Sequence, residues 1–343
     1  MLNLAKQAKV ASLIMAGTLL LAACGNGGAS AGGGAGGNGE RQTLFFLPIN
    51  DTGAYWSVML AGARAEAEAL GFDLEHRIAP SINPQRNEMQ IGAVREAVAQ
   101  NAAGMSIAPI DPDMLDRVVQ EAADAGIPVV TFDSDVATAA NRVAYVGTDN
   151  FDAGRILGIR AAEHLIANGV TEGSLQVVMT WLTQTTMILR QAGIMDGFNE
   201  VMGDQAANFR FLEPIEDQAQ STVSMQQLEA RIVANPDLVA VFSLGAEGPT
   251  TGVMEALRSQ GMGHIIPHFG FDFTPTWLNG IEEGLVVGIV NQNAYEIGRT
   301  VIRTKVDVIE GREVPDTIPI EATWVYAADI EEHGQLIQER MGE

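Results

Sequence analysis

The chain has 343 residues, of which 47% are hydrophobic, and its formal net charge is −23. A chain of this length is too long for one ordinary domain and suits two. The strong negative charge argues against nucleic acids and anionic membrane surfaces as partners. The acidic residues are scattered among apolar ones, which is typical of solvated helix faces rather than of an acidic tail. We therefore expect a globular protein with two lobes.

The first 23 residues have the pattern of an export leader. Lys6 and Lys9 precede an apolar segment at residues 10–21, which at about a dozen residues is too short to span a bilayer comfortably. The string LAAC, which ends at Cys24, resembles the bacterial lipobox, in which the cysteine thiol is lipidated and becomes the new N-terminus. We therefore expect residues 1–23 to be a lipoprotein signal peptide and Cys24 to carry a membrane anchor. The alternative is a chance cysteine behind a leader.

Residues 24–42 are expected to be a tether. Nine of the fifteen residues at 25–39 are glycine, and none of the fifteen is an apolar residue larger than alanine. Such a composition cannot form a core. Cys24 is the only cysteine in the chain, so an internal disulfide is excluded.

From Thr43 onward, short apolar strands alternate with helices that carry an apolar stripe. This alternation predicts parallel sheets with right-handed crossovers. Similar numbers of units lie on either side of Asp149, which predicts two similar lobes. The expected strands cover residues 43–49, 72–78, 104–110, 127–132, 175–180, 209–213, 238–245 and 264–272, and the expected helices cover residues 56–70, 89–98, 112–122, 151–167, 190–201, 221–233 and a segment that ends at 259.

The segment AGIPVVTFDSD at residues 125–135 predicts a fully buried parallel strand that ends on polar residues. In open α/β sheets, ligands bind just beyond the carboxyl ends of the strands. Asp133, Ser134 and Asp135 would then protrude where a small molecule binds. The alternative is that these residues only cap a turn.

Seven motifs in order resemble the type I periplasmic binding proteins of the ribose and galactose kind, which share their fold with the effector domains of LacI-like repressors. The resemblance covers roughly Thr43 to Tyr326. A leader stands where a repressor would carry its DNA-binding segment, so the repressor interpretation fails. The motifs are AYWSVMLAGARAEAEALG, AGIPVVTFDSD, VGTDNFDAGRILG, RQAGIMDGF, VFSLGAEGPTTGVMEAL, FGFDF and NQNAYEIG.

The resemblance implies an α/β fold with two Rossmann-like lobes, each with a parallel sheet, joined by a three-stranded hinge. The N-terminal lobe would comprise residues 43–148 plus 293–320. The C-terminal lobe would comprise residues 149–292 plus 321–343.

The resemblance also implies a ligand cleft. Asp133 matches a carboxylate that accepts hydrogen bonds from ligand hydroxyls, and Arg190 matches a ligand arginine with a fixed fork of donors. Asp272 ends its strand as Asp133 does, and Gln292 matches an amide at the second hinge crossing. Asp135 is expected to be structural. The expected ligand-binding residues are Tyr55, Trp56, Asp133, Trp181, Arg190, Glu247, Asp272 and Gln292.

The aromatic candidates have alternative interpretations. Tyr55 and Trp56 match a pair that sandwiches the sugar, but Trp56 also fits the core stripe of its helix. Trp181 would either add a second stacking face or pack against a helix. Two departures put a pentose in doubt: Gly53 stands where ribose-type members have Asn, and Ala246-Glu247 stand where many have Asn-Asp.

The function implied is capture of a sugar or polyol and its delivery to an ABC transporter permease by a monomeric, lipid-anchored receptor outside the cytoplasm. The alternative is a sensor that docks on a chemoreceptor or histidine kinase. A carbohydrate-active enzyme would need Asp133 and Asp272 as acid and base. No cofactor or metal is expected, because His264 and His268 fall on an expected strand and do not form a zinc pair.

Overall fold

The computed structural model describes residues 41–49, 53–78, 85–245, 248–273 and 276–341. The expected signal peptide, Cys24 and most of the expected tether lie outside these residues. From Arg41 onward the chain forms one unit, and its strands are divided between two sheets. In these described ranges, no helix combines the length and the apolar character needed to cross a membrane.

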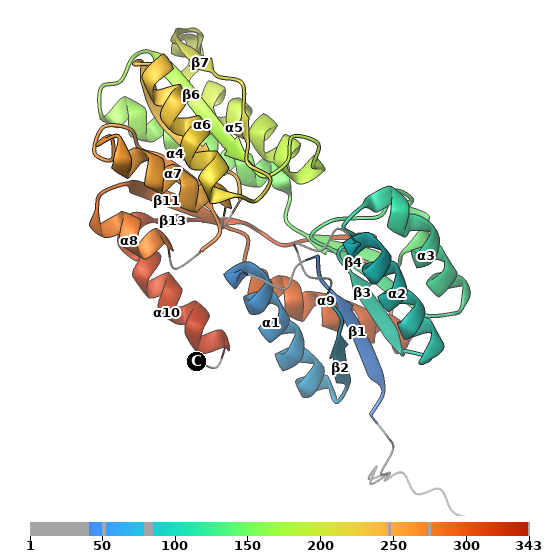
Figure 1. Ribbon diagram of the computed structural model, residues 1–343. Helices are drawn as coiled ribbons and strands as arrows, with labels where there is room; N and C mark the ends of the chain where they lie inside the picture. Colours follow the sequence, from blue (N-terminus) through green and yellow to red (C-terminus); the bar gives the residue numbers. More distant parts are fainter. Residues whose placement is uncertain (1–40, 50–52, 79–84, 246–247, 274–275, 342–343) are drawn as a thin grey trace, which may run out of the picture. The chain divides into compact units, whose positions relative to one another are not determined.

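The first sheet is parallel throughout, with the strand order β12-β5-β4-β3-β1-β2. Helices cover both of its faces (Figure 1). Its strands are β1 (Thr43–Leu47), β2 (Asp73–His76), β3 (Gly104–Ile107), β4 (Val129–Phe132), β5 (Ala144–Gly147) and β12 (Thr317–Pro319), and its helices are α1 (Ala54–Leu70), α2 (Arg86–Ala99), α3 (Pro112–Asp124) and α9 (Ala294–Ile309).

The alternation along β1 explains why both faces are covered. Leu44 and Phe46 belong to the core beneath α1 and α9, whereas Phe45 and Leu47 belong to the core beneath α2 and α3. All four side chains are fully buried. Because successive strand residues point to opposite faces, a strand that is apolar at every position must be buried on both sides.

The second sheet has the order β13-β11-β10-β9-β6-β7, with β8 also paired to β6. Its strands are parallel except for β13, which pairs antiparallel to β11. The strands are β6 (Gly173–Met179), β7 (Phe209–Phe211), β8 (Ile215–Glu216), β9 (Leu238–Ser243), β10 (His268–Phe271), β11 (Val286–Asn291) and β13 (Thr323–Tyr326), and the helices are α4 (Asn150–Ala167), α5 (Thr185–Met202), α6 (Ser221–Ala234), α7 (Gly248–Ser259), α8 (Thr276–Glu282) and α10 (Ile330–Met341). Short 3₁₀ turns η2 (Gly203–Asn208) and η3 (Ala327–Asp329) lie beside this sheet, and a third, η1 (Ala139–Asn141), connects β4 to β5 in the first sheet.

The chain passes between the two sheets three times. It leaves the first sheet after β5, returns after β11 to build α9 and β12, and leaves again before β13. α9 packs on β3, β4 and β5 and so belongs with the first sheet. The expected α/β fold with two mostly parallel sheets is confirmed.

Two expected elements differ from the structure. β10 begins only at His268, because residues 264–267 form a turn in which the N–H of Ile265 donates to the carbonyl of Met262 (2.9 Å). Pro267 has no N–H to give to a ladder. The expectation that His264 lies on a strand is therefore wrong.

α5 begins at Thr185 rather than near Arg190. Ile188 and Leu189 are apolar but exposed. They therefore break the apolar stripe by which the start of a helix is recognised in sequence.

Candidate ligand-binding site

Two aspartates occupy equivalent places in the two sheets. Asp133 follows β4 and Asp272 follows β10, and each strand is third in its sheet, counted from β12 and β13. The N–H of Asp133 donates to Val146 on β5 (3.2 Å), and the N–H of Asp272 donates to Val290 on β11 (2.8 Å). Because ligands of open α/β sheets bind beyond the carboxyl ends of strands, both carboxylates lie where a ligand is expected.

Both aspartates also share an uncommon backbone conformation. Their φ angles are 61° for Asp133 and 53° for Asp272, in the left-handed region that residues other than glycine seldom adopt. The surrounding structure fixes each one through its carbonyl. The hydroxyl of Tyr145 donates to Asp133 O (3.1 Å), and the indole N–H of Trp277 donates to Asp272 O (2.8 Å). A strained backbone conformation of this kind persists only where several neighbouring groups hold it in place, and such residues are common at functional sites.

Asp133 accepts a hydrogen bond from the hydroxyl of Tyr55, in the first turn of α1 (2.7 Å). Burial, together with the nearby charge of Asp133, raises the pKa of Tyr55 well above its usual value, so this hydroxyl stays protonated as a donor. Burial also raises the pKa of Asp133, although the Tyr55 hydrogen bond and Arg190 oppose this. A carboxylate has about four acceptor positions, so Asp133 retains capacity for ligand hydroxyls.

Arg190, on α5, is buried with 6% of its surface exposed. Its guanidinium lies over the ring of Phe271, with the central carbon 4.3 Å from the ring centre. Its donors reach Oδ1 of Asn150 (2.8 Å), the carbonyl of Leu244 (2.8 Å) and Oε1 of Gln292 (2.7 Å). The fork of donors is thus held in one orientation by three partners from different parts of the chain.

Gln292 connects Arg190 to Asp272. Its side-chain amide donates to Oδ2 of Asp272 (2.6 Å), and its backbone N–H donates to Oδ1 (3.3 Å). Burial raises the pKa of Asp272 to about 6, against the opposing influence of Arg190 and Gln292. Gln292 lies directly after β11, where the chain leaves the second sheet.

Close packing of α4 against α5 positions Arg190. A Cβ atom on Gly154 of α4 would lie 2.1 Å from the carbonyl oxygen of Arg190, and one on Gly193 of α5 would lie 2.0 Å from that of Phe151. Any side chain at either position would force the helices apart. The glycines in the motifs VGTDNFDAGRILG and RQAGIMDGF therefore set the distance at which Arg190 is presented.

The structure brings Tyr55, Asp133, Arg190, Asp272 and Gln292 together through hydrogen bonds and electrostatic contacts.

The other candidates are placed differently. Trp56 is half-buried, packs on the core and meets the edge of the Tyr55 ring, with the ring centres 5.1 Å apart. Trp181 lies in the turn between β6 and α5, and within the described ranges no ring contact links it to the other candidates. Glu247 lies outside the described residues. Gly53 precedes α1 with φ 91° and ψ 150°, a region essentially restricted to glycine, so the backbone itself requires glycine there.

Two supporting residues were not among the sequence candidates. Asn150 begins α4 and orients Arg190, and Tyr145 on β5 fixes the carbonyl of Asp133. Asn150 lies within the motif VGTDNFDAGRILG, which was the signal that could have found it, whereas Tyr145 lies just before that motif and acts on a backbone carbonyl. In the described part of the chain, no group of three or more His, Cys, Asp or Glu side chains is arranged to hold a metal ion.

Comparison with known proteins gives a consistent result. A family model described as "Periplasmic binding protein domain" matches residues 44–313. The ribose import binding protein RbsB of Escherichia coli is 27% identical over 262 residues, which covers 76% of this chain and 82% of that protein.

Solved structures also match over nearly their full length. A glucose-galactose binding protein, GanP, from Geobacillus stearothermophilus has a TM-score of 0.74 and 24% identity, and the match covers 85% of this chain and 99% of that one. A carbohydrate transporter solute binding protein from Agrobacterium radiobacter, in complex with D-arabinose, has a TM-score of 0.76 and 24% identity over 88% of this chain and 99% of that one. At this level of identity the structural matches establish the fold.

Proposed function

Because the chain belongs to the periplasmic binding protein domain family, we propose that it captures a sugar or polyol and delivers it to the permease of an ABC transporter. The observation that carries this proposal is the pair of strand-end carboxylates, Asp133 and Asp272, each held in the left-handed conformation beside Arg190. The similarity to a ribose import protein and to sugar-binding structures supports it.

The chemistry of the site suits a neutral ligand rich in hydroxyls. Asp133 and Asp272 supply acceptors, Arg190 supplies donors, and Tyr55 and Trp56 supply aromatic surface next to Asp133. Hydroxyl groups both donate and accept, so they pair with carboxylates and guanidinium alike, while the C–H face of a sugar ring packs on aromatic rings.

We propose that residues 43–148 plus 293–320 form one lobe and residues 149–292 plus 321–343 the other. The membership of β12 in the first sheet, and of β11 and β13 in the second, supports this division. Asp133 and Tyr55 would then lie on one lobe and Arg190 and Asp272 on the other. A ligand that contacts both sides favours the closed form, so binding shifts the population towards it.

The test is a thermal-shift screen of residues 41–343 against D-ribose, D-arabinose, D-galactose, D-allose, D-tagatose and myo-inositol, with an amino acid and a nucleoside as controls. A ligand at 100 times its dissociation constant adds about 2.7 kcal/mol of stability, which such a screen resolves. We expect a shift with at least one sugar or polyol and recovery of that ligand unchanged. A shift with the controls alone would overturn the ligand class, and turnover of the sugar would establish an enzyme.

Binding rather than catalysis fits the state of Asp272. Both of its oxygens already accept hydrogen bonds from Gln292. A glycosidase pair needs one carboxylic acid free to protonate the leaving group. We propose that the protein is a monomer that binds its sugar without turning it over, and the similarity to a ribose import protein supports this.

We also propose that the mature chain begins at a lipidated Cys24, which would anchor it outside the cytoplasm. The basic and apolar leader and the LAAC string support this.

Cys24→Ser is expected to move the protein from the membrane fraction to the soluble fraction when cells are fractionated. Ser30→Ala, a change in the same glycine-rich segment, should leave it on the membrane. Membrane retention of the Cys24→Ser protein would contradict lipidation.

A further inference from the structure

Asp133 lies at the tip of a tight reverse turn. Directly after β4 the chain folds back, and the N–H of Ser134 donates to the carbonyl of Phe132 (2.7 Å). The hydroxyl of Ser134 donates to the carbonyl of Pro109 (2.7 Å). The returning chain brings Asp135 beside β4, where it accepts a hydrogen bond from the hydroxyl of Thr131 (2.6 Å). The position of the Asp133 carboxylate therefore depends on how firmly the base of this turn is held.

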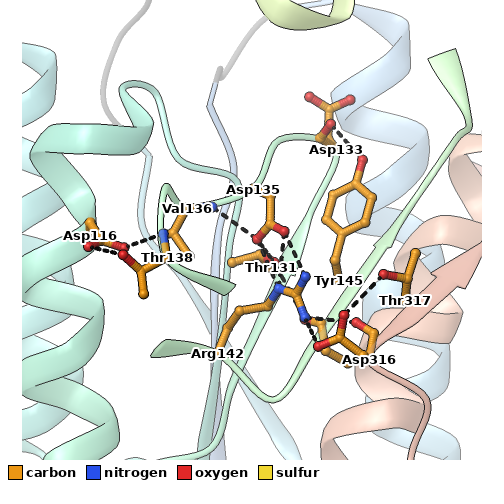
Figure 2. Close-up of polar contacts among 11 residues, drawn as sticks. Asp116, Thr131, Asp133, Asp135, Val136, Thr138, Arg142, Tyr145, Asp316 and Thr317 are labelled. Atoms are coloured by element: carbon orange, nitrogen blue, oxygen red, sulfur yellow. Dashed lines mark hydrogen bonds and ion pairs between the residues drawn. The ribbon is translucent and has the colours of Figure 1, made fainter. Parts of the chain in front are cut away.

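Arg142 holds the base of the turn (Figure 2). Its Nε lies 3.0 and 3.1 Å from the two oxygens of Asp135, and its Nη2 lies 2.8 Å from Oδ2. Only 4% of the Arg142 side chain is exposed, compared with 30% of the Asp135 side chain. A bidentate pair is geometrically strict, because the planar guanidinium fork must lie in line with the two carboxylate oxygens.

The same arginine reaches the strand that leads out of the first sheet. Its Nη1 donates to the carbonyl oxygen and to Oδ1 of Asp316, both at 2.8 Å. Asp316 directly precedes β12, and its carbonyl also accepts the N–H of Tyr145 (2.9 Å). β12 is the last strand before the chain crosses to the second sheet. Arg142 thus joins the turn that carries Asp133 to a strand that enters the hinge.

Tyr145 holds the tip of the turn as Arg142 holds its base. Its hydroxyl donates to the main-chain carbonyl of Asp133, as the dashed line in Figure 2 shows. Gly147 leaves room for this hydroxyl: a Cβ atom on Gly147 would lie 2.3 Å from it. The conformation of Asp133, with its φ of 61°, is therefore fixed from both ends of the turn.

We infer that Arg142 and Tyr145 are positioning residues for ligand binding, which hold the Asp133 carboxylate at the orientation that the ligand requires. This inference rests on the proposed function, because it takes Asp133 to be a ligand contact. Neither residue needs to touch the ligand. Arg142 and Tyr145 would change the affinity only by moving the Asp133 carboxylate. Their effect should therefore disappear when that carboxylate is removed, whereas an effect on overall stability would remain.

The test measures the dissociation constant of the sugar that gives the largest thermal shift in the panel named above. Arg142→Lys keeps the charge but loses the planar fork. We expect it to weaken binding by about 10- to 100-fold, as loss of an outer-shell partner does at metal sites. In an Asp133→Asn background, where the carboxylate to be positioned is already gone, the same change should have little further effect on affinity. An equal loss of affinity in both backgrounds would overturn the inference.

A second variant and a control complete the test. Tyr145→Phe removes only the hydroxyl. It should also weaken binding in the wild-type background but not in the Asp133→Asn background. This variant tests the inference even if Arg142→Lys does not fold. Arg77→Lys breaks a bidentate but more exposed pair with Glu96 next to β2 in the same sheet and should leave affinity unchanged. If the wild type binds a sugar while Arg142→Lys and Tyr145→Phe bind it equally well, the inference fails and the proposed function stands. If the wild type binds no sugar or polyol, both fail.

Discussion

Arg190→Ala is expected to abolish detectable sugar binding and to lower the free energy of unfolding by about 3 to 5 kcal/mol, the usual effect of removing one partner from a buried ionic network. The guanidinium satisfies Asn150, Leu244 and Gln292 and moderates the negative charge of Asp133 and Asp272. Its removal leaves buried acceptors unpaired and takes away the positive charge that offsets the two carboxylates. The measurements are urea unfolding and calorimetric titration with the sugar found in the screen.

Two further variants separate binding from stability. Arg190→Lys keeps the positive charge but cannot reach three acceptors in a planar fork, so it should recover part of the stability and little of the affinity. Arg155→Ala breaks an ion pair between the same two helices, with Asp196 and Glu200, at the surface. We expect it to change stability by less than about 1 kcal/mol and to leave affinity unchanged. Unchanged sugar affinity in Arg190→Ala would remove Arg190 from the site.

Most of the architecture could be predicted from the sequence, because buried parallel strands are apolar at every position. The strand that ends at Phe132 and the glycine stop after Leu70 could be located from such local patterns. Errors arose where local pattern and tertiary structure disagree. The apolar segment before His268 is a turn, and exposed apolar residues concealed the first turn of α5. Hydrophobicity alone does not distinguish these cases.

The site was predictable where chemistry follows the end of a strand. Asp133 and Asp272 each come directly after an apolar strand, which places them at a sheet edge without knowledge of the tertiary structure. Gln292 was expected only from the family resemblance, because the strand before it, β11, was not predicted from the sequence. Their part in ligand binding stays a prediction. The contacts that orient them could not be derived, because Arg190 meets Gln292 across 102 residues of sequence, and Arg142 meets Asp316 across 174. A single sequence carries no record of such pairs.

Asp272→Asn is expected to stabilise the ligand-free protein at pH 8 while weakening sugar binding. Burial raises the pKa of Asp272 from 3.8 to about 6, so the folded state binds a proton more tightly than the unfolded state between these values. The stability that protonation confers is therefore complete below pH 3.8 and is lost as the pH rises through about 6. The loss amounts to about 3 kcal/mol in the wild type. Asparagine is neutral at every pH, so the Asp272→Asn protein does not lose this stability as the pH rises.

The asparagine amide also loses a hydrogen bond, so the effect of Asp272→Asn on stability changes sign with pH. Asparagine offers one acceptor oxygen where Asp272 uses both of its oxygens to hold Gln292, so one hydrogen bond worth about 1 kcal/mol is lost. We therefore expect Asp272→Asn to be less stable than the wild type at pH 4 and more stable at pH 8, in urea unfolding at both values. The wild type should bind its sugar more tightly as the pH rises through about 6, because the ionised carboxylate accepts more hydrogen bonds from hydroxyls.

Asp217 provides the matched control. Burial raises its pKa to about 6 as well, but its carboxylate accepts hydrogen bonds from Ser224 (2.5 Å) and from the N–H of Ala219 (2.8 Å) rather than from Tyr55 or Gln292. Asp217→Asn should alter the pH dependence of unfolding and leave sugar affinity unchanged. Equal affinity in the Asp272→Asn protein and the wild type at pH 8 would show that Asp272 does not contact the ligand. If instead Asp272→Asn gains stability and loses affinity, the ligand-free protein maintains an unfavourable buried charge that a bound sugar offsets.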